Sequence, residues 1–217
     1  MTVISMAIIC DGTSDLCLQN IVEWIADTAF PTQAFRIFAA REVVPARGTL
    51  QERLRKAQRA YEPSMIICHR DAEAMTLQDR INEVNAAQVA SNLPILVVPA
   101  VPVRMIESWL LIDQAAIRCA ADNKNGTSDL SLPSPNKIEQ LGDPKEILFT
   151  ALRKASNLPP QRLKKFNENR ARSRVASFIE NFGSLRALQS FQLFEQGLIR
   201  DIGTLQMQLA QLRLDAK

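Results

Sequence analysis

The sequence predicts an α/β fold in which a mostly parallel sheet is flanked by helices and followed by a C-terminal helical lobe. In the first half of the chain, short apolar runs typical of buried strands alternate with longer amphipathic segments typical of helices. The second half shows helical spacing of its apolar residues. A chain of 217 residues, 47% of them hydrophobic, is long enough for one large domain or for one domain with an appended lobe.

Four apolar runs are the predicted strands. The central run, residues 65–68 (Met-Ile-Ile-Cys), is apolar on both faces and stops abruptly at charged residues. Pro99 indicates that the last run lies near a sheet edge or ends early. In chain order, the predicted strands cover residues 3–10, 34–39, 65–68 and 94–101. Helical crossovers between parallel strands should be right-handed.

Helix signals fill the segments between these strands. Gly12 supplies a tight turn after the first strand, and Thr49 is placed to cap a helix that Pro63 stops. After the last strand, Glu107 falls in the first turn of a further helix, whose Trp109 packs inward. The predicted helices cover about residues 14–28, 50–61, 77–92 and the segment that begins at 102.

Composition changes near residue 121, because the stretch over 122–135 is rich in Asn, Ser, Asp, Gly and Pro. We expect an α/β core over residues 1–120, a loop or flap over 121–143, and a helical lobe over 144–217 packed on the core. Pro144 is placed to open the first helix of that lobe. The last helix carries an apolar stripe that could pair two chains, but its glycines favour packing within the chain.

Several classes of protein are excluded by what the sequence lacks. No apolar run approaches the roughly 18 residues that a membrane span needs, and the amino terminus has no signal-peptide pattern. Four cysteines without CxxC spacing favour reduced thiols in a cytoplasmic protein. One histidine, His69, excludes a zinc site built on several imidazoles, and no P-loop motif is present. Any chemistry must therefore depend on carboxylates, lysine and arginine.

Acidic residues end the first predicted strand (Asp11), follow the central one (Asp71 and Glu73), and open the helix after the last one (Glu107). Carboxyl ends of parallel strands meet at one edge of the sheet, where such folds place their ligands. Two carboxylates about 4 Å apart repel by about 4 kcal/mol at an effective dielectric near 20, so a converging group needs a proton, a cationic partner or a metal. Oxygen ligands without imidazole select Mg²⁺ or Mn²⁺. We predict that these four acids bind such an ion.

Each acid also has an ordinary structural interpretation. Asp11 could hydrogen-bond within the turn at Gly12, and Asp71 could cap the helix after it. Glu73 could be a solvated loop residue, and Glu107 a first-turn acid that complements the helix dipole. The metal site is the favoured hypothesis, because four such residues would otherwise reach one edge by accident.

A basic segment lies in the predicted lobe. Between residues 153 and 174 there are eight Lys and Arg residues and one acid, Glu168, although the net charge of the chain is only +3. Such a cluster gives salt-dependent, sequence-independent affinity for phosphates, although charge runs are often only solvated surfaces. Lys145 and Arg174 are our candidates for stabilising charge on a phosphate in the transition state. The predicted nucleic-acid-binding residues are Arg162, Lys164, Lys165, Arg170, Arg172 and Arg174.

Three motifs together resemble the TOPRIM superfamily: Asp-Gly-Thr-Ser-Asp at residues 11–15, His-Arg-Asp-Ala-Glu at 69–73, and Ile-Glu-Ser-Trp-Leu-Leu at 106–111. The similarity is closest to an uncharacterised TOPRIM-like bacterial family met in mobile and phage-defence loci, related to the overcoming-lysogenization-type nucleases. It spans most of the chain, and Glu-Ser-Trp-Leu-Leu is its most specific part. It implies a TOPRIM-like, Rossmann-like sheet.

The resemblance implies Mg²⁺-dependent (or Mn²⁺-dependent) cleavage of phosphodiester bonds in nucleic acid. It implies that Asp11 acts as a general acid or base or binds the metal, and that Asp71 and Glu73 are metal ligands. In our interpretation Glu107 supports this site from the neighbouring helix, and Lys145 is the second catalytic residue. Asp11 stands where the pattern usually has Glu, and Glu73 where it has Asp. The shorter Asp11 favours an alternative, a non-catalytic module that binds nucleic acid or a partner ATPase. A phosphoacceptor receiver domain is a weaker third hypothesis, because the expected strand-end lysine is missing. The oligomeric state stays open.

Overall fold

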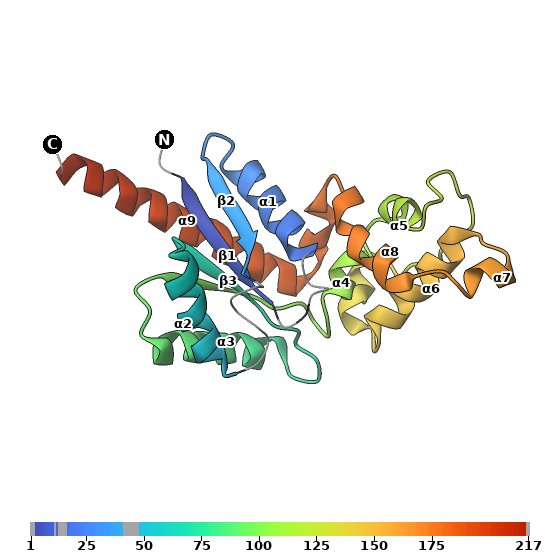
Figure 1. Ribbon diagram of the computed structural model, residues 1–217, viewed down its shortest axis with the longest axis horizontal. Helices are drawn as coiled ribbons and strands as arrows, with labels where there is room; N and C mark the ends of the chain where they lie inside the picture. Colours follow the sequence, from blue (N-terminus) through green and yellow to red (C-terminus); the bar gives the residue numbers. More distant parts are fainter. Residues whose placement is uncertain (1–2, 11, 13–16, 41–47, 216–217) are drawn as a thin grey trace.

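Four strands form one all-parallel sheet in the part of the chain that the computed structural model describes, residues 3–10, 12, 17–40 and 48–215. The strands are β1 (Ile4–Ile9), β2 (Phe35–Ala39), β3 (Met65–His69) and β4 (Leu96–Ala100), and they lie in the order β2-β1-β3-β4 (Figure 1). The predicted α/β fold with a parallel sheet flanked by helices is therefore confirmed.

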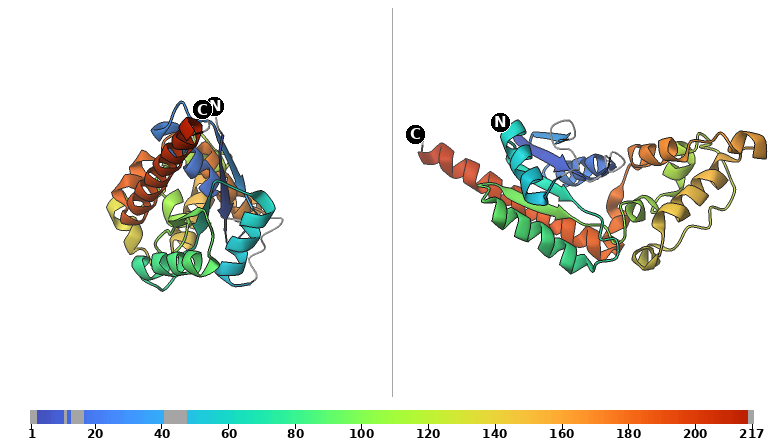
Figure 2. Two further views of the ribbon diagram at one scale, coloured as in Figure 1. Left: turned by 90° about the vertical axis from the view of Figure 1, so that its left-hand side faces the viewer. Right: turned by 60° about the horizontal axis from the view of Figure 1, so that its bottom comes forward.

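The side chains of β3 alternate between two apolar cores. Met65 and Ile67 join the larger core, together with residues of α1 (Cys17–Ala29) and α9 (Gln189–Asp215). Ile66 and Cys68 join a smaller core with residues of α2 (Leu50–Tyr61) and α3 (Leu77–Ser91). The sheet is thus the middle layer between two layers of helices (Figures 1 and 2). Burial on both faces explains why this strand is a continuous apolar run.

Short polar residues begin the helices of the core. Thr49 accepts a hydrogen bond from the backbone N–H of Glu52, and the Glu52 carboxylate accepts one from the N–H of Thr49, which together make a capping box. Thr76 caps α3 in a similar way. Helix α2 covers the predicted range, residues 50–61.

Helices of 4 to 13 residues fill the second half of the chain up to α9. They are α4 (Glu107–Leu110), α5 (Gln114–Ala120), α6 (Pro144–Ser156), α7 (Pro160–Leu163) and α8 (Glu168–Arg174), with 3₁₀ turns η2 (Pro135–Gln140), η3 (Ala176–Phe178) and η4 (Phe182–Ala187). Helices α5 to α8 gather beyond one end of the sheet, at the right of Figure 1. The segment over 121–143 contains η2, and its Leu130 and Ile138 are buried in the larger core. Part of the expected loop is therefore packed against the protein.

Helix α9 packs against both the sheet and the second half of the chain. The Trp109 ring lies 5.5 Å from that of Phe191 and 5.7 Å from that of Phe194, measured between centroids, and its Nε1–H donates to Oγ of Ser190 at 3.1 Å. The buried residues of α9 end at Ile202, and the rest of the helix projects past the sheet (Figure 1). Neither α9 nor any other helix of the described ranges has the length and apolar character needed to cross a membrane.

Candidate active site at the carboxyl edge of the sheet

The sheet has its topological switch point between β1 and β3. From β1 the chain crosses to β2 on one side, and it later returns to β3 and β4 on the other. Strands β1 and β3 pair in parallel with Ile9 opposite Cys68, so the residues that follow them leave the sheet at the same edge. In open α/β sheets, ligands bind outside the carboxyl ends of the strands at such a point. The predicted acidic residues follow the carboxyl ends of these two strands in the sequence.

Asp11, which the sequence predicts as a catalytic residue and a metal ligand, lies outside the described residues. It follows Ile9, the last residue of β1, by two positions. Just before it, the carbonyl of Cys10 accepts a 2.7 Å hydrogen bond from Nη2 of Arg53, a buried side chain of α2. A guanidinium group therefore lies at the end of β1.

Asp71 links the loops that follow β3 and β4. Its Oδ1 accepts a 2.9 Å hydrogen bond from the backbone N–H of Ile106, and it lies 3.3 Å from Nε2 of His69. The alternative in which Asp71 caps the next helix is wrong, because Thr76 caps α3. The Asp71 side chain is 30% exposed, and no hydrogen bond to its Oδ2 is found among the described residues. One carboxylate oxygen is thus oriented by the protein, and the other is open to a ligand.

The loops after β3 and β4 continue the pairing of the two strands through a strained backbone. N–H groups of the first loop donate to carbonyls of the second at 2.8–3.2 Å: Arg70 to Ala100, Ala72 to Pro102, and Glu73 to Arg104. Glu73 and Arg104 both have positive φ, 53° and 63°. The left-handed conformation costs a non-glycine residue about 1–2 kcal/mol, and such strain concentrates at functional sites. The ladder holds this strained pair beside Asp71.

Glu73 projects from the same edge into solvent. Its side chain is 74% exposed, and it contacts Nη2 of Arg80 at 3.3 Å. The Arg80 side chain is almost buried, and its closer contact is with Glu83. Glu83 also lies 3.3 Å from Arg70. The Glu73 carboxylate is therefore held loosely and is accessible to a cation from solution.

Glu107 and Arg172, which the sequence assigns to different sites, form one buried ion pair. Nε of Arg172 donates to Oε1 of Glu107 at 2.6 Å, and both side chains are only 4% exposed. The carboxylate is neutralised by its partner, and neither group reaches the surface. The pair therefore joins α4 to α8, and we remove Glu107 from the candidate metal ligands and Arg172 from the candidate phosphate contacts.

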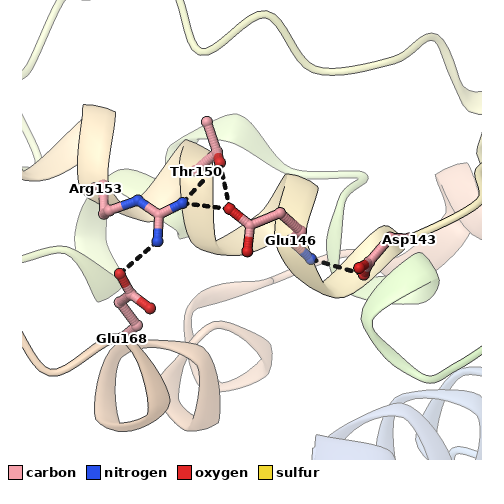
Figure 3. Close-up of polar contacts among 5 residues, drawn as sticks. All are labelled: Asp143, Glu146, Thr150, Arg153 and Glu168. Atoms are coloured by element: carbon pink, nitrogen blue, oxygen red, sulfur yellow. Dashed lines mark hydrogen bonds and ion pairs between the residues drawn. The ribbon is translucent and has the colours of Figure 1, made fainter.

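Lys145, the second predicted catalytic residue, lies exposed in the first turn of α6. Its ammonium is 5.7 Å from the ring centroid of Phe149. Among the described residues, no hydrogen bond or ion pair joins it to Asp71 or Glu73. The start of its helix is fixed by Asp143, which accepts a hydrogen bond from the backbone N–H of Glu146 (Figure 3). A catalytic role for Lys145 stays a prediction.

The remaining predicted phosphate contacts lie near α7 and α8. Lys164 is exposed. The other four line a single cavity: Arg162, Lys165, Arg170 and Arg174. The structure thus brings together most of the predicted basic residues, in a place separate from the carboxyl edge of the sheet.

Asp71 and Glu73 offer carboxylate oxygens, the type of ligand that a hard divalent cation takes. Mg²⁺ is commonly held by one or two carboxylates while it keeps several waters, and both Asp71 and Glu73 present accessible oxygens. Within the described ranges, no group of three or more His, Cys, Asp or Glu side chains is arranged to hold a metal ion. A Mg²⁺ site of two carboxylates and water does not require such a group.

No protein-family model, curated protein or solved structure matches this chain. The TOPRIM resemblance therefore stays a prediction. What the chain does must be inferred from its own residues and their arrangement.

Two features of the carboxyl edge are not predicted from the sequence. The first is the left-handed backbone of Arg104, whose Nη1 donates to the carbonyl of Glu73 at 3.2 Å. A non-glycine residue in this conformation leaves no signal in the sequence. The second is buried Arg80, which lies on the same helical face as Val84 and Ala87. The helical spacing of Arg80 with these two apolar residues is the sequence feature that could have indicated its burial.

Proposed function

We propose that this chain is a Mg²⁺-dependent or Mn²⁺-dependent nuclease that hydrolyses phosphodiester bonds of nucleic acid, as the TOPRIM resemblance implies, with a place in phage defence. The observation that carries the proposal is the position of Asp71. It stands at the carboxyl end of β3, at the switch point of the sheet, with Oδ1 fixed by Ile106 and the side chain partly open to solvent.

The residues at this edge have complementary tasks in the proposed reaction. A bound divalent ion would activate a water molecule and offset charge on the leaving oxygen. Asp71 and Glu73 would hold that ion, and the backbone N–H of Ile106 would fix the orientation of Asp71. Asp11, by its place after β1, would complete the ligand set. Arg104, exposed on the same edge, places a positive charge where an anionic substrate approaches.

A non-catalytic module that binds nucleic acid or a partner ATPase is the second candidate function. The buried pair of Glu107 with Arg172 favours this function, because Glu107 is then not available to a metal. Of the four acids predicted as metal ligands, Asp71 and Glu73 are the ones in the described residues that stay accessible. The shorter side chain at Asp11 favours it as well.

Asp71→Asn separates the charge of this residue from its structural role. Asparagine keeps an oxygen that can accept the hydrogen bond of Ile106, so the fold should be retained while the carboxylate is lost. Parent and variant are incubated with single- and double-stranded DNA and RNA, in Mg²⁺, Mn²⁺ or EDTA. We expect metal-dependent cleavage by the parent, background cleavage by the variant, and melting temperatures within about 2–4 °C, the shift that 1 kcal/mol produces in a chain of this size.

Asp27→Asn is the matched control, because Asp27 is an exposed acid of α1. Melting in the presence of Mn²⁺ gives a second readout. The ion should raise the melting temperature of the parent and of the control but not that of Asp71→Asn. Equal cleavage by Asp71→Asn and the parent contradicts the mechanism. A parent that shows neither cleavage nor a Mn²⁺ shift supports the non-catalytic module.

A further inference from the structure

A cavity of about 240 Å³ lies between α5, α7 and α8, and its charged lining is almost entirely basic. Arg162 and Lys165 come from α7 and the turn after it, three positions apart. Arg170 and Arg174 come from α8, four positions apart. These spacings place each pair on one side of its segment. Two segments thus present two cations each to one concavity, and Asp122 is the acid in the lining.

The residues that the structure describes balance only part of the positive charge of this lining. Asp122 pairs with Arg174, at 2.8 Å between Oδ1 and Nη1. For Arg162, Lys165 and Arg170, no side-chain ion pair or hydrogen bond is formed with any residue that the structure describes. Three cations of the lining therefore have no acidic partner among the described residues.

The acid nearest to these cations in sequence is held elsewhere. Glu168 opens α8, but its Oε1 accepts a 2.6 Å hydrogen bond from Nη1 of Arg153 on α6. Figure 3 shows Arg153 between Glu168 and Glu146. The hydrogen bonds with Glu168 and Glu146 raise the pKa of the Arg153 guanidinium above its usual value. Because Arg153 holds Glu168, this carboxylate does not neutralise the cations of the cavity.

Such an arrangement is suited to an anion. Converging cations repel one another, and a bound anion removes that repulsion. Arg174 is preorganised, since Asp122 holds its guanidinium and the ring of Phe178 lies 5.3 Å away. Pockets for drug-sized ligands are roughly 300–1,000 Å³, so this smaller cavity fits one phosphate ester better than a whole large ligand.

The cavity is also connected to the candidate active site by direct contacts. Arg172 lies between two cavity residues on α8 and is paired with Glu107 of α4. Ile106, which directly precedes α4, donates its N–H to Asp71. A ligand held in the cavity is therefore positioned relative to the carboxyl edge through α8 and α4.

We propose that this cavity binds a phosphate group of a nucleic-acid strand and anchors the strand for the candidate active site. The phosphate binding stands on the cavity alone, whereas the choice of nucleic acid rests on the proposed function. The phosphate could be an internal phosphodiester or a terminal phosphate, which share the same recognition chemistry.

The first test uses inorganic phosphate as the probe and the melting temperature as the readout, at constant ionic strength. The Lys165→Gln/Arg170→Gln variant removes two unpaired cations of the lining. The Lys56→Gln/Arg59→Gln variant is the matched control, because it removes the same charge from the exposed side of α2. Phosphate should raise the melting temperature of the parent and of the control, and most of this shift should be lost in the cavity variant. An equal shift in all three proteins overturns the proposal.

The second test measures the binding of fluorescent single strands by anisotropy in EDTA, with and without a 5′-phosphate. The slope of log K against log[salt] is negative, and it should become shallower by about 1.4 in the cavity variant, about 0.7 for each of the two lost contacts with a single strand. If the affinity of the cavity variant is lowered by the same factor for both strands, the phosphate is internal. If it loses a preference of the parent for the 5′-phosphorylated strand, the phosphate is terminal.

One outcome of these tests overturns the assignment to nucleic acid, and another overturns the whole proposal. If the phosphate shift is lost but strand binding is unchanged, the cavity is a small-anion site and the assignment to nucleic acid is wrong. If both readouts match the parent, the cavity binds no phosphate. In the same assay, which contains EDTA, Asp71→Asn should bind the strands as the parent does. The binding test of the cavity is therefore independent of whether the proposed catalytic mechanism is correct.

Discussion

At the scale of single residues, Glu107 and Arg172 lie almost completely out of water and contact each other. Removing a charge from water costs several kcal/mol even after the protein relaxes, and the attraction within a pair offsets this only while both partners are present. A bound metal would have to compete with the guanidinium for the carboxylate, and a phosphate with the carboxylate for the guanidinium. Burial therefore gives both residues a structural role.

Arg172→Met should destabilise the protein by about 3–5 kcal/mol, because it leaves the Glu107 carboxylate buried without its partner. The double variant Glu107→Leu/Arg172→Met should recover most of that loss, since it removes the buried carboxylate together with the guanidinium. Urea unfolding of both variants measures the difference. A single variant of unchanged stability but weaker strand binding would return Arg172 to the phosphate contacts.

Sequence reasoning locates Asp71 because the residue lies two positions after an apolar strand, and strand ends share one edge in a parallel sheet. It does not find the partner of Glu107, which lies 65 positions away. Which charges meet depends on how α4 docks against α8, and that docking is set by the packing of the whole helical part. Charged residues at strand ends are thus more predictable than charged residues on short helices.

At the scale of elements, the loops after β3 and β4 combine regular pairing with two left-handed residues, Glu73 and Arg104. Either residue would relax to an ordinary conformation if the loop were free, because the left-handed form costs about 1–2 kcal/mol. The hydrogen-bonded ladder over-determines the backbone and keeps Glu73 at the edge of the site. The strain is therefore part of how the loops present this carboxylate.

Glu73→Gly should be more stable than Glu73→Ala by about 0.5–1 kcal/mol. Glycine adopts the left-handed conformation without the steric cost, and this gain exceeds the loss from its larger unfolded-state entropy. Thermal or urea unfolding measures the difference. At Lys56, inside α2, the order should reverse, with Lys56→Ala the more stable. Alanine above glycine at both positions would show that the Glu73 backbone is not strained.

The elements themselves are mostly predictable, because their signals are local. The capping box of Thr49 and Glu52 fixes the start of α2, and the apolar run fixes β3. The left-handed residues at the carboxyl ends of helices divide into two kinds. Asparagine commonly adopts this conformation, so Asn92 is a recognisable end of α3. Glutamate does not, and at Glu62 the following proline is what indicates the end of α2.

At the scale of the whole molecule, the larger core crosses the expected boundary at residue 120. It contains Ile8 and Ile67 of the sheet as well as Leu148 and Phe182 of the second half. The glycines of the last helix favour packing of its apolar stripe within the chain, but the stripe does not identify the sheet face that α9 covers or the contact of α9 with Trp109. That information lies in the docking of distant segments, which no local pattern contains.

A fragment of residues 1–120 should therefore not fold alone. It lacks the four large side chains that α9 buries, namely Phe191, Phe194, Leu198 and Ile202. At about 1.5–3 kcal/mol each, they contribute about 6–12 kcal/mol, which is comparable to the whole stability of a typical domain. We expect no cooperative melting transition for the fragment, and one transition when it is co-expressed with residues 121–217.

A chain that ends after residue 203 is the control for this prediction. It loses only the projecting end of α9, and the buried residues of that helix end at Ile202. It should therefore keep a single transition, with a small decrease in melting temperature, because Leu205 and Leu209 are only partly buried against the core. A cooperative melt of fragment 1–120 by itself would mean that the sheet has a core of its own, and that α9 adds stability without being required for the fold.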